Sequence, residues 1–280
     1  MSLLVSSRPA RPSFHRLSVA RVERLTPDSV AVWLEVPADL SDTFAFKPGQ
    51  YVTLRHLIDE VDVRRDYSLC LSPGQAKSSG QIRIAASRVS GGAMSNWLID
   101  DVAVGDQIPV LPPRGEFDCA IEPGQARQHV AIAAGSGVTP IISIVRSLLE
   151  SPEDARVIAV LGNRSAEHVM FADEWDELER AHPDQLSVVH VFSRQVASEP
   201  NAEIAKPASG RLSAAVIEQV LKSSGAEVGP ATQWYVSGPS AVVEAGIEVA
   251  GRADAGPGCV HQEIFHVADA SEAAQEPANG

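Results

Sequence analysis

Residues 129–140 read HVAIAAGSGVTP, a continuous apolar run followed by a glycine-rich turn and the start of a helical pattern. An unbroken apolar run is typical of a strand that is buried on both faces of a parallel sheet. The turn holds Gly135, Gly137, Thr139 and Pro140, and proline suits the first turn of a helix. Because ligands of open α/β sheets bind beyond the carboxyl ends of the strands, this turn is a candidate binding site.

The sequence around and after this turn alternates apolar runs with helical patterns. We expect further strands at 155–163, 186–193 and 233–239, and helices at 136–151, 165–182, 212–224 and 240–252. This alternation predicts βαβ units and an open parallel sheet. We therefore expect an α/β domain at residues 127–267, followed by a disordered tail or linker at residues 268–280 that is rich in Ala, Glu, Pro and Gly.

The first part of the chain has a different pattern, of short alternating segments rich in Val, Ile and Leu. These segments lie at 15–25, 29–36, 50–58, 66–72 and 81–89, with Gly, Pro and Asp between them. Several short strands at this spacing predict an antiparallel β-barrel or sandwich over residues 13–122, interrupted by a helix at 95–103. The predicted architecture is thus two domains, an antiparallel β-barrel followed by an open α/β parallel sheet.

Charge and cysteine spacing exclude several classes of protein. The chain has 23 basic and 36 acidic side chains and a net charge of −13, the opposite of what nucleic-acid-binding proteins show. Cys70, Cys119 and Cys259 are too widely spaced for a zinc knuckle or a plant-type 2Fe–2S cluster, so we expect no metal. Three scattered cysteines, with neither a signal peptide nor a long apolar stretch, predict a cytoplasmic protein that has no membrane partner.

Two more clusters carry residue types that bind phosphates, although each has a plainer interpretation. Arg65, Tyr67 and Ser68 lie in a predicted strand, and taken alone they favour the plainer interpretation, an ordinary edge strand with one exposed arginine. The turn at residues 91–95 precedes the helical segment, so its glycines and the helix N-terminus offer a pyrophosphate site. The alternative for this turn is a plain turn in which Ser95 is the N-cap.

These clusters occur with other motifs in a fixed order. The motifs, between about residues 14 and 267, include FKPGQYVTLR, RRDYSLC, GGAMSNWL, AIAAGSGVTPIISIV, LGNRS, FSRQ, SGP and VHQEIF. In this combination the chain resembles the ferredoxin–NADP reductase family of flavoproteins, and within it oxygenase reductases such as the reductase subunits of phenylacetyl-CoA epoxidases. The resemblance implies an FAD-binding β-barrel followed by an NAD(P)-binding α/β domain.

The resemblance also implies which residues bind FAD. Arg65 would hold the pyrophosphate, Tyr67 would stack on the isoalloxazine ring, and Ser68 would lie near the reactive edge of that ring. The second phosphate-binding turn corresponds to Gly91, Gly92, Ala93, Met94 and Ser95. His261, Glu263 and Phe265 match a closing H-x-E-x-F motif that lies near the flavin.

A second set of residues would bind the pyridine nucleotide. They match the G-x-G-x-T-P turn, the G-N-R strand end, a Ser–Arg pair and a Gly–Pro step: Gly135, Gly137, Thr139, Pro140, Asn163, Arg164, Ser193, Arg194, Gly238 and Pro239. The family usually has a cysteine, which helps to place the nicotinamide, where this chain has Ser237. We expect Ser68, Ser237 and Glu263 to be the catalytic residues, with slower hydride transfer because of the serine.

The expected function is therefore that of an FAD-dependent oxidoreductase. It would pass electrons from NADPH, or from NADH, through FAD to a one-electron acceptor such as a separate ferredoxin or an oxygenase component. The relatives continue into a 2Fe–2S domain, so we expect either that the acceptor is a separate protein or that a cluster domain has been lost or removed. The alternative is a flavin-binding electron-transfer or regulatory subunit with weak hydride transfer, which the serine at position 237 suggests.

Arginines lead to two finer expectations. Arg164 and Arg194 follow the second and third predicted strands of the α/β domain, where the ribose 2′ position should lie, so we expect a preference for NADPH. Residues 1–122 have a net charge of −2 and residues 123–280 a net charge of −11, so an acidic acceptor would dock on the β-barrel. The arginines expected to form its basic face, unless they are scattered singly, are Arg55, Arg64, Arg83, Arg88 and Arg114.

Overall fold

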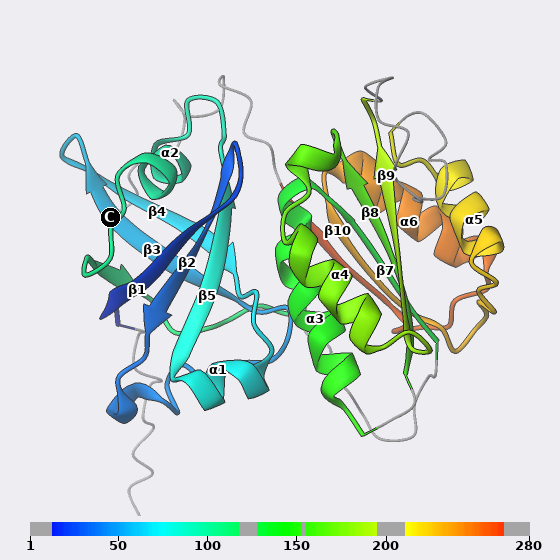
Figure 1. Cartoon of the computed structure of the whole chain (residues 1–280), viewed down its shortest axis with the longest axis horizontal. Coiled ribbons are helices and arrows are strands. Elements are labelled where there is room, and N and C mark those ends of the chain that lie inside the picture. The colour runs from blue at the N-terminus through cyan, green and yellow to red at the C-terminus, as the bar shows by residue number, and fades with distance from the viewer. Residues whose placement is uncertain (1–12, 118–127, 153–154, 195–210, 266–280) are drawn as a thin grey trace, which may run out of the picture.

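The computed structural model describes residues 13–117, 128–152, 155–194 and 211–265, which form two sheets side by side (Figure 1). The sequence-predicted tail at 268–280 and Cys119 lie outside these residues. Among the described helices, none combines the length and the apolar character that crossing a bilayer requires.

The first sheet is antiparallel and contains six strands in the order β4-β3-β6-β1-β2-β5. The strands are β1 (His15–Thr26), β2 (Ser29–Glu35), β3 (Tyr51–Ile58), β4 (Val61–Ser68), β5 (Gln81–Ser87) and β6 (Gln107–Val110). A bridge between Leu69 and Ile84 joins the two edges of the sheet, just beyond β4 and within β5, so the sheet closes on itself. Its inner face is packed with aliphatic side chains such as Leu17, Leu34 and Leu54, as the alternating sequence pattern predicts.

Two helices and a short 3₁₀ turn, η1 (Ala38–Leu40), accompany the barrel. The predicted helix at 95–103 is present as α2 (Ala93–Asp100). The sequence did not predict α1 (Pro73–Ser79), which has a complete capping box: the Ser72 side chain accepts from the Gln75 N–H, and the Gln75 side chain accepts from the Ser72 N–H. A serine followed three residues later by glutamine, with proline at the first helical position, is the signal that was available.

The second sheet is parallel and contains five strands in the order β11-β10-β7-β8-β9. The strands are β7 (Gln128–Ala134), β8 (Arg156–Asn163), β9 (Leu186–Phe192), β10 (Gln233–Gly238) and β11 (Val260–Ile264). The helices are α3 (Val138–Glu150), α4 (Ala172–Ala181), α5 (Ala214–Ser223) and α6 (Ser240–Arg252), with 3₁₀ turns η2 (Gly135–Gly137) and η3 (Ala166–His168). Helices α3 and α4 cover the sheet face toward the barrel, and α5 and α6 cover the other face (Figure 1). The antiparallel barrel followed by an open parallel α/β sheet confirms the predicted fold class.

Two elements differ from the sequence prediction. The helix expected at 165–182 is divided into η3 and α4, because Phe171 adopts a left-handed backbone conformation with φ of 61° directly before α4. The strand β11 was not predicted, because its five residues contain His, Gln and Glu and do not form an apolar run. It lies at the edge of the sheet, where one face and one side of a strand are open to polar surroundings.

Helix α3 joins the two domains. Eleven of its 13 residues are buried, including Thr139 and Pro140. Its apolar side chains belong to a cluster that includes Ala31, Cys70 and Ala85 of the barrel as well as strands of the α/β sheet. The helix is buried on nearly all sides because it lies between the barrel and the sheet.

Candidate functional site

Strand β4 holds the R-x-Y-S residues at its carboxyl end. Ser68 is the last residue of the strand, is buried, and pairs with Tyr51 of β3 in the antiparallel register. Tyr67 is half-buried, and this burial raises the pKa of its phenol. Arg65 is exposed; its Nη1 donates to the Arg64 carbonyl at 2.7 Å, and it pairs with no described carboxylate. Because alternate residues of a strand point to the same face, Arg65 and Tyr67 present a cation and a ring side by side.

The turn before α2 leaves backbone N–H groups available. Gly91 has a φ of 71°, which favours glycine, and Gly92 is the residue that precedes the helix. No side chain caps this helix, and Ser95 lies inside its first turn, where its hydroxyl accepts from the Val89 N–H at 3.2 Å. The alternative in which Ser95 is the N-cap is therefore wrong. The uncapped N-terminus, with Ala93 and Met94 as its first residues, is a suitable site for an anion.

The turn after β7 packs against the end of β10. A Cβ atom at Gly137 would lie 2.5 Å from the Ser237 carbonyl oxygen, so a side chain at this position would force the two strand ends apart. Thr139 closes the turn by donating its hydroxyl to the Ser136 carbonyl at 2.8 Å. The glycine turn and Ser237 therefore form one edge of the site.

The ends of β10 and β11 hold two buried polar atoms that lack partners. Ser237 Oγ and Glu263 Oε2 have no hydrogen-bond partner among the described residues, although Ser237 is fully buried. The two residues pair in the parallel register. Burial, together with the negative charge of Asp66 on β4, raises the pKa of Glu263 to about 7. Buried polar groups normally have a partner, so this pair of atoms indicates a place where a bound polar group completes the structure.

The residues around Glu263 are held by the neighbouring strand. Phe265 is half-buried, and its N–H donates to the Gly238 carbonyl at 2.9 Å. The His261 ring stacks on Tyr235 with centroids 5.0 Å apart. These contacts fix the closing H-x-E-x-F segment beside β10.

A cavity of about 290 Å³ lies at the carboxyl ends of β7, β8 and β9. Of the residues predicted to bind the nucleotide, five line it: Gly135, Asn163, Arg164, Ser193 and Pro239. Arg194 is not among the lining residues; it is exposed, and its N–H donates to the Arg164 carbonyl at 2.9 Å. The structure thus brings one of the two predicted arginines into the cavity.

Sequence reasoning missed three ionisable residues of this cavity. His168 and Arg211 line it from the α/β domain, and Asp28 lines it from the turn between β1 and β2 of the barrel. Arg164 Nη2 donates to Asp28 Oδ2 at 2.7 Å. No local pattern in the sequence connects Asp28 with Arg164, which lies 136 residues further along the chain.

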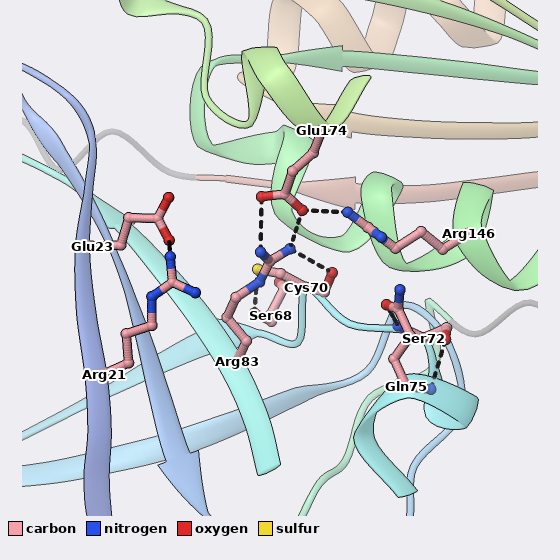
Figure 2. A network of polar contacts seen from close by, with 9 residues as sticks. All are labelled: Arg21, Glu23, Ser68, Cys70, Ser72, Gln75, Arg83, Arg146 and Glu174. Atoms are coloured by element: carbon pink, nitrogen blue, oxygen red, sulfur yellow. Dashed lines mark hydrogen bonds and ion pairs between the residues drawn. The ribbon is translucent and has the colours of Figure 1, made fainter. Parts of the chain in front are cut away.

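A second ionic contact crosses the domain boundary close to Ser68 (Figure 2). Arg83 of β5 donates from Nη1 and Nη2 to the two carboxylate oxygens of Glu174 on α4, at 2.8 and 3.0 Å, and Arg146 of α3 donates to the same carboxylate. Arg83 also donates to the Cys70 carbonyl at 3.2 Å. Cys70 is buried, which raises the pKa of its thiol to about 12, and the thiol donates to the Ser68 carbonyl at 3.5 Å. The segment that follows Ser68 is therefore tied to helices α3 and α4 of the α/β domain.

The predicted basic face of the barrel needs correction. The Arg83 side chain is only 4% exposed and cannot meet a partner protein. Arg55 and Arg64 both pair with Asp62, while Arg88 pairs with Asp100 and Arg114 with Asp66. The surface arginines thus have acidic neighbours, and their positive charge is largely compensated.

Comparison with known proteins identifies both domains. Residues 16–119 match the family of oxidoreductase FAD-binding domains, and residues 131–246 match the family of oxidoreductase NAD-binding domains. Over 183 residues, 65% of this chain and 50% of the relative, the chain is 32% identical to one of the subunits of 1,2-phenylacetyl-CoA epoxidase from Escherichia coli (strain K12). It is 38% identical over 175 residues to the ferredoxin reductase component of 3-ketosteroid-9-alpha-monooxygenase from Rhodococcus rhodochrous, covering 62% of this chain and 48% of that protein. The chain spans about half the length of these curated relatives.

A solved structure confirms the arrangement of the domains. The cytochrome P450 reductase GcoB of Amycolatopsis is 25% identical, with a TM-score of 0.71 over 94% of this chain and 73% of that one. The matched structure covers both the barrel and the parallel sheet. The chain therefore belongs to the oxidoreductases that combine an FAD-binding domain with an NAD-binding domain, a family that includes the ferredoxin reductases.

Proposed function

We propose that this chain oxidises NADPH with FAD and passes the electrons to a one-electron acceptor, either a ferredoxin or an oxygenase component. The observation that carries the proposal is a pair of buried atoms, Ser237 Oγ and Glu263 Oε2, which have no partner among the described residues and lie where the ends of β10 and β11 approach β4. The hydride transfer from the nicotinamide and the release of single electrons are chemistry that bound FAD supplies. The named relatives, one component of an epoxidase and a reductase component of a monooxygenase, support the choice of acceptor.

Residues of the barrel fit FAD. Arg65 would hold the pyrophosphate, since its guanidinium has no described carboxylate partner and charge-assisted bonds to phosphate are strong. The uncapped turn formed by residues 91–95 would hold the same group with its backbone N–H groups. Tyr67 would pack on the flavin ring, and Ser68 would contact the edge of that ring. Two phosphate-binding positions favour a dinucleotide, FAD, over FMN.

Residues of the α/β domain fit a pyridine nucleotide. Gly135, Gly137, Thr139 and Pro140 would form the turn over its diphosphate, at the end of the first strand. Asn163, Ser193 and Pro239 line the 290 Å³ cavity that would receive the adenosine half, and Gly238 and Arg194 are their neighbours in the sequence. The proposed domains are residues 13–122 and 127–267, followed by a linker-like tail at 268–280.

Three residues would act at the meeting point of the cofactors. Ser237 would orient the nicotinamide with its otherwise unsatisfied hydroxyl. Glu263, whose pKa of about 7 makes both protonation states accessible, would donate or accept a hydrogen bond near the flavin. Phe265 would shield the flavin from water on that side. A cytoplasmic location belongs to the same proposal.

The test is an anaerobic titration of the purified protein with NADPH and with NADH, followed at the visible flavin absorption band. We expect stoichiometric bleaching by NADPH, and chromatography of heat-released flavin should identify FAD. Recovery of FMN alone would overturn the cofactor assignment. Yellow protein that neither nucleotide bleaches would instead support the alternative, a flavin-binding subunit with weak hydride transfer.

The preference for NADPH needs its own measurement. Arg164 and Arg211 both line the cavity and offer cations to a 2′-phosphate. We expect kcat/KM to be higher for NADPH than for NADH, and we expect Arg211→Ala to reduce this ratio more than Arg194→Ala does. Arg252→Ala, on the exposed end of α6, is the matched control. Equal kcat/KM values for the two nucleotides in the wild type would contradict the preference.

A further inference from the structure

We propose that Asp28 is a specificity-determining residue of the nucleotide cavity, where it limits the binding of nucleotides that carry a 2′-phosphate. The inference rests on the proposed function, because it requires that the cavity receives the adenosine half of a pyridine nucleotide. Asp28 belongs to the barrel, yet it lines this cavity of the α/β domain and accepts a hydrogen bond from Arg164 at 2.7 Å.

Asp28 is the fixed member of this pair. The Thr26 hydroxyl lies 3.0 Å from Asp28 Oδ1, and the Asp28 N–H donates to the same hydroxyl. The Arg88 N–H also donates to the Asp28 carbonyl at 2.8 Å. The Asp28 side chain is 25% exposed, whereas that of Arg164 is 52% exposed. A ligand in the cavity therefore meets a carboxylate that its neighbours hold and a guanidinium that is more exposed.

The position of the pair matches the place where the two nucleotides differ. Arg164 follows β8, the second strand along the α/β domain, and in dinucleotide-binding sheets this is where the ribose 2′ position is recognised. Enzymes that use NAD usually place an acid there, and enzymes that use NADP place an arginine. Here the arginine comes from the expected strand end, and the acid comes from the other domain.

The two residues have opposite effects on a 2′-phosphate. Arg164 attracts it, but Asp28 already occupies that guanidinium and adds a like charge beside the phosphate. For a nucleotide with a free 2′-hydroxyl, the Asp28 carboxylate is instead a hydrogen-bond acceptor. Asp28 thus reduces the preference for NADPH that Arg164 and Arg211 provide.

The charged side chains near the Arg164–Asp28 pair make contacts with other residues. The guanidinium of Arg88, whose backbone N–H donates to Asp28, makes two short bonds to Asp100, at 2.6 and 2.7 Å. His168 also lines the cavity, and its imidazole lies 3.6 Å from the Glu167 carboxylate. Replacing Asp28 by asparagine would keep the contact of Oδ1 with Thr26, and it would remove both the negative charge and the oxygen that accepts from Arg164.

Equilibrium binding of nucleotide fragments tests the inference without turnover. The probes are 2′,5′-ADP and 5′-AMP, titrated calorimetrically into the flavin-loaded wild type, Asp28→Asn, Arg164→Gln and the double variant. We expect Asp28→Asn to bind 2′,5′-ADP about tenfold more tightly, a difference of about 1.4 kcal/mol, and to bind 5′-AMP within twofold of the wild type. The gain should disappear in the double variant, and Asp100→Asn is the matched control that should show no gain.

Each other outcome has a defined meaning. Equal changes for the two fragments in Asp28→Asn, or no change for either, would overturn the role of Asp28 while leaving the nucleotide site in place. A gain that persists in the double variant would also overturn it, because the effect would not act through Arg164. If the wild type binds neither fragment at millimolar concentration, the nucleotide site itself fails, and the inference fails with the proposed function.

Discussion

The two ionic contacts between the barrel and the α/β domain differ in what surrounds them. Arg83 and Glu174 make a bidentate contact, and their side chains are only 4% and 24% exposed. The rings of Trp33 and Phe171 lie 5.1 and 4.9 Å from the guanidinium carbon of Arg83. Arg164 and Asp28 meet at the wall of a cavity, with a single bond and a half-exposed arginine. An arginine–carboxylate pair therefore stabilises the packing of the two domains at Arg83 and Glu174. At Arg164 and Asp28, the same kind of pair can give way to a contact with a ligand.

The largest expected effect is the loss of the buried contact. In Glu174→Gln, Arg83 and Arg146 would remain beside each other without a carboxylate, and breaking a buried ion pair on one side costs about 3–5 kcal/mol. We expect the free energy of unfolding, measured by chemical denaturation, to fall by about this amount. Glu218→Gln, which removes an exposed partner of Arg252, is the control and should cost less than about 1 kcal/mol.

If Glu174→Gln lost as little free energy of unfolding as the control, the Arg83–Glu174 contact would not stabilise the packing of the domains, and the distinction between the two contacts would be wrong. The two positive charges beside Glu174 allow a second test of the same contact. Two guanidiniums share one carboxylate, and neither Arg83 Nε nor Arg146 Nε has a partner among the described residues. Arg146→Met in the Glu174→Gln background should therefore recover part of the stability, because it removes one of two like charges.

The next largest effect concerns Glu263, whose buried Oε2 has no partner among the described residues. The pKa of Glu263 is raised to about 7 from its ordinary value of 4.5, so between these values the folded protein holds a proton that the unfolded chain has released. The contribution of this group to stability is therefore highest below pH 4.5 and falls as the pH rises to 7. Glu263→Gln should be more stable than the wild type at pH 8 by about 2 kcal/mol, because solvent screens part of the penalty, and the two should differ little at pH 4.5.

Thermal unfolding of both proteins between pH 4.5 and pH 8 measures this difference. Glu244→Gln on α6, whose side chain lies on the exposed surface of the helix, controls for the loss of one acidic charge. A constant difference in Tm across the range would show that the wild-type carboxyl titrates at its ordinary pKa. Glu263 would then behave like an exposed carboxylate, and not like a buried one.

The smallest effect is expected at the cavity. Asp28→Asn should change the free energy of unfolding by less than about 1 kcal/mol, because Arg164 is half-exposed and exposed pairs contribute little. Denaturation of this variant beside Glu174→Gln gives the contrast directly. A loss of several kcal/mol would mean that the Asp28 contact is also part of the framework.

Local patterns in the sequence were sufficient for most of the fold. The unbroken run of β7 and the alternating strands of the barrel predicted two kinds of sheet, because burial on one or two faces determines the period of apolar residues. The predictions failed where a short element is stabilised by capping or by its neighbours. Helix α1 depends on the capping box at Ser72 and Gln75, and β11 depends on pairing with β10.

The candidate site was predictable where one segment supplies it. The turn after β7 and the strand end at Asn163 and Arg164 both line the cavity, because the carboxyl ends of parallel strands meet at one edge. Asp28 and Glu174 were not predictable, since each acts on the other domain through a contact between distant parts of the chain. The effect of Asp66 on the pKa of Glu263 was not predictable for the same reason, because Asp66 lies on the barrel and Glu263 on the α/β sheet.

The burial of α3 has a consequence for how the protein loses its structure. This helix packs on the sheet behind it and on the barrel in front of it, and the Ser143 hydroxyl donates to the Leu71 carbonyl of the barrel at 2.7 Å. Either domain alone would present a wide apolar surface to water, which isolated soluble domains rarely tolerate. The two domains should therefore melt in one cooperative transition, and neither half should remain soluble when it is produced without the other.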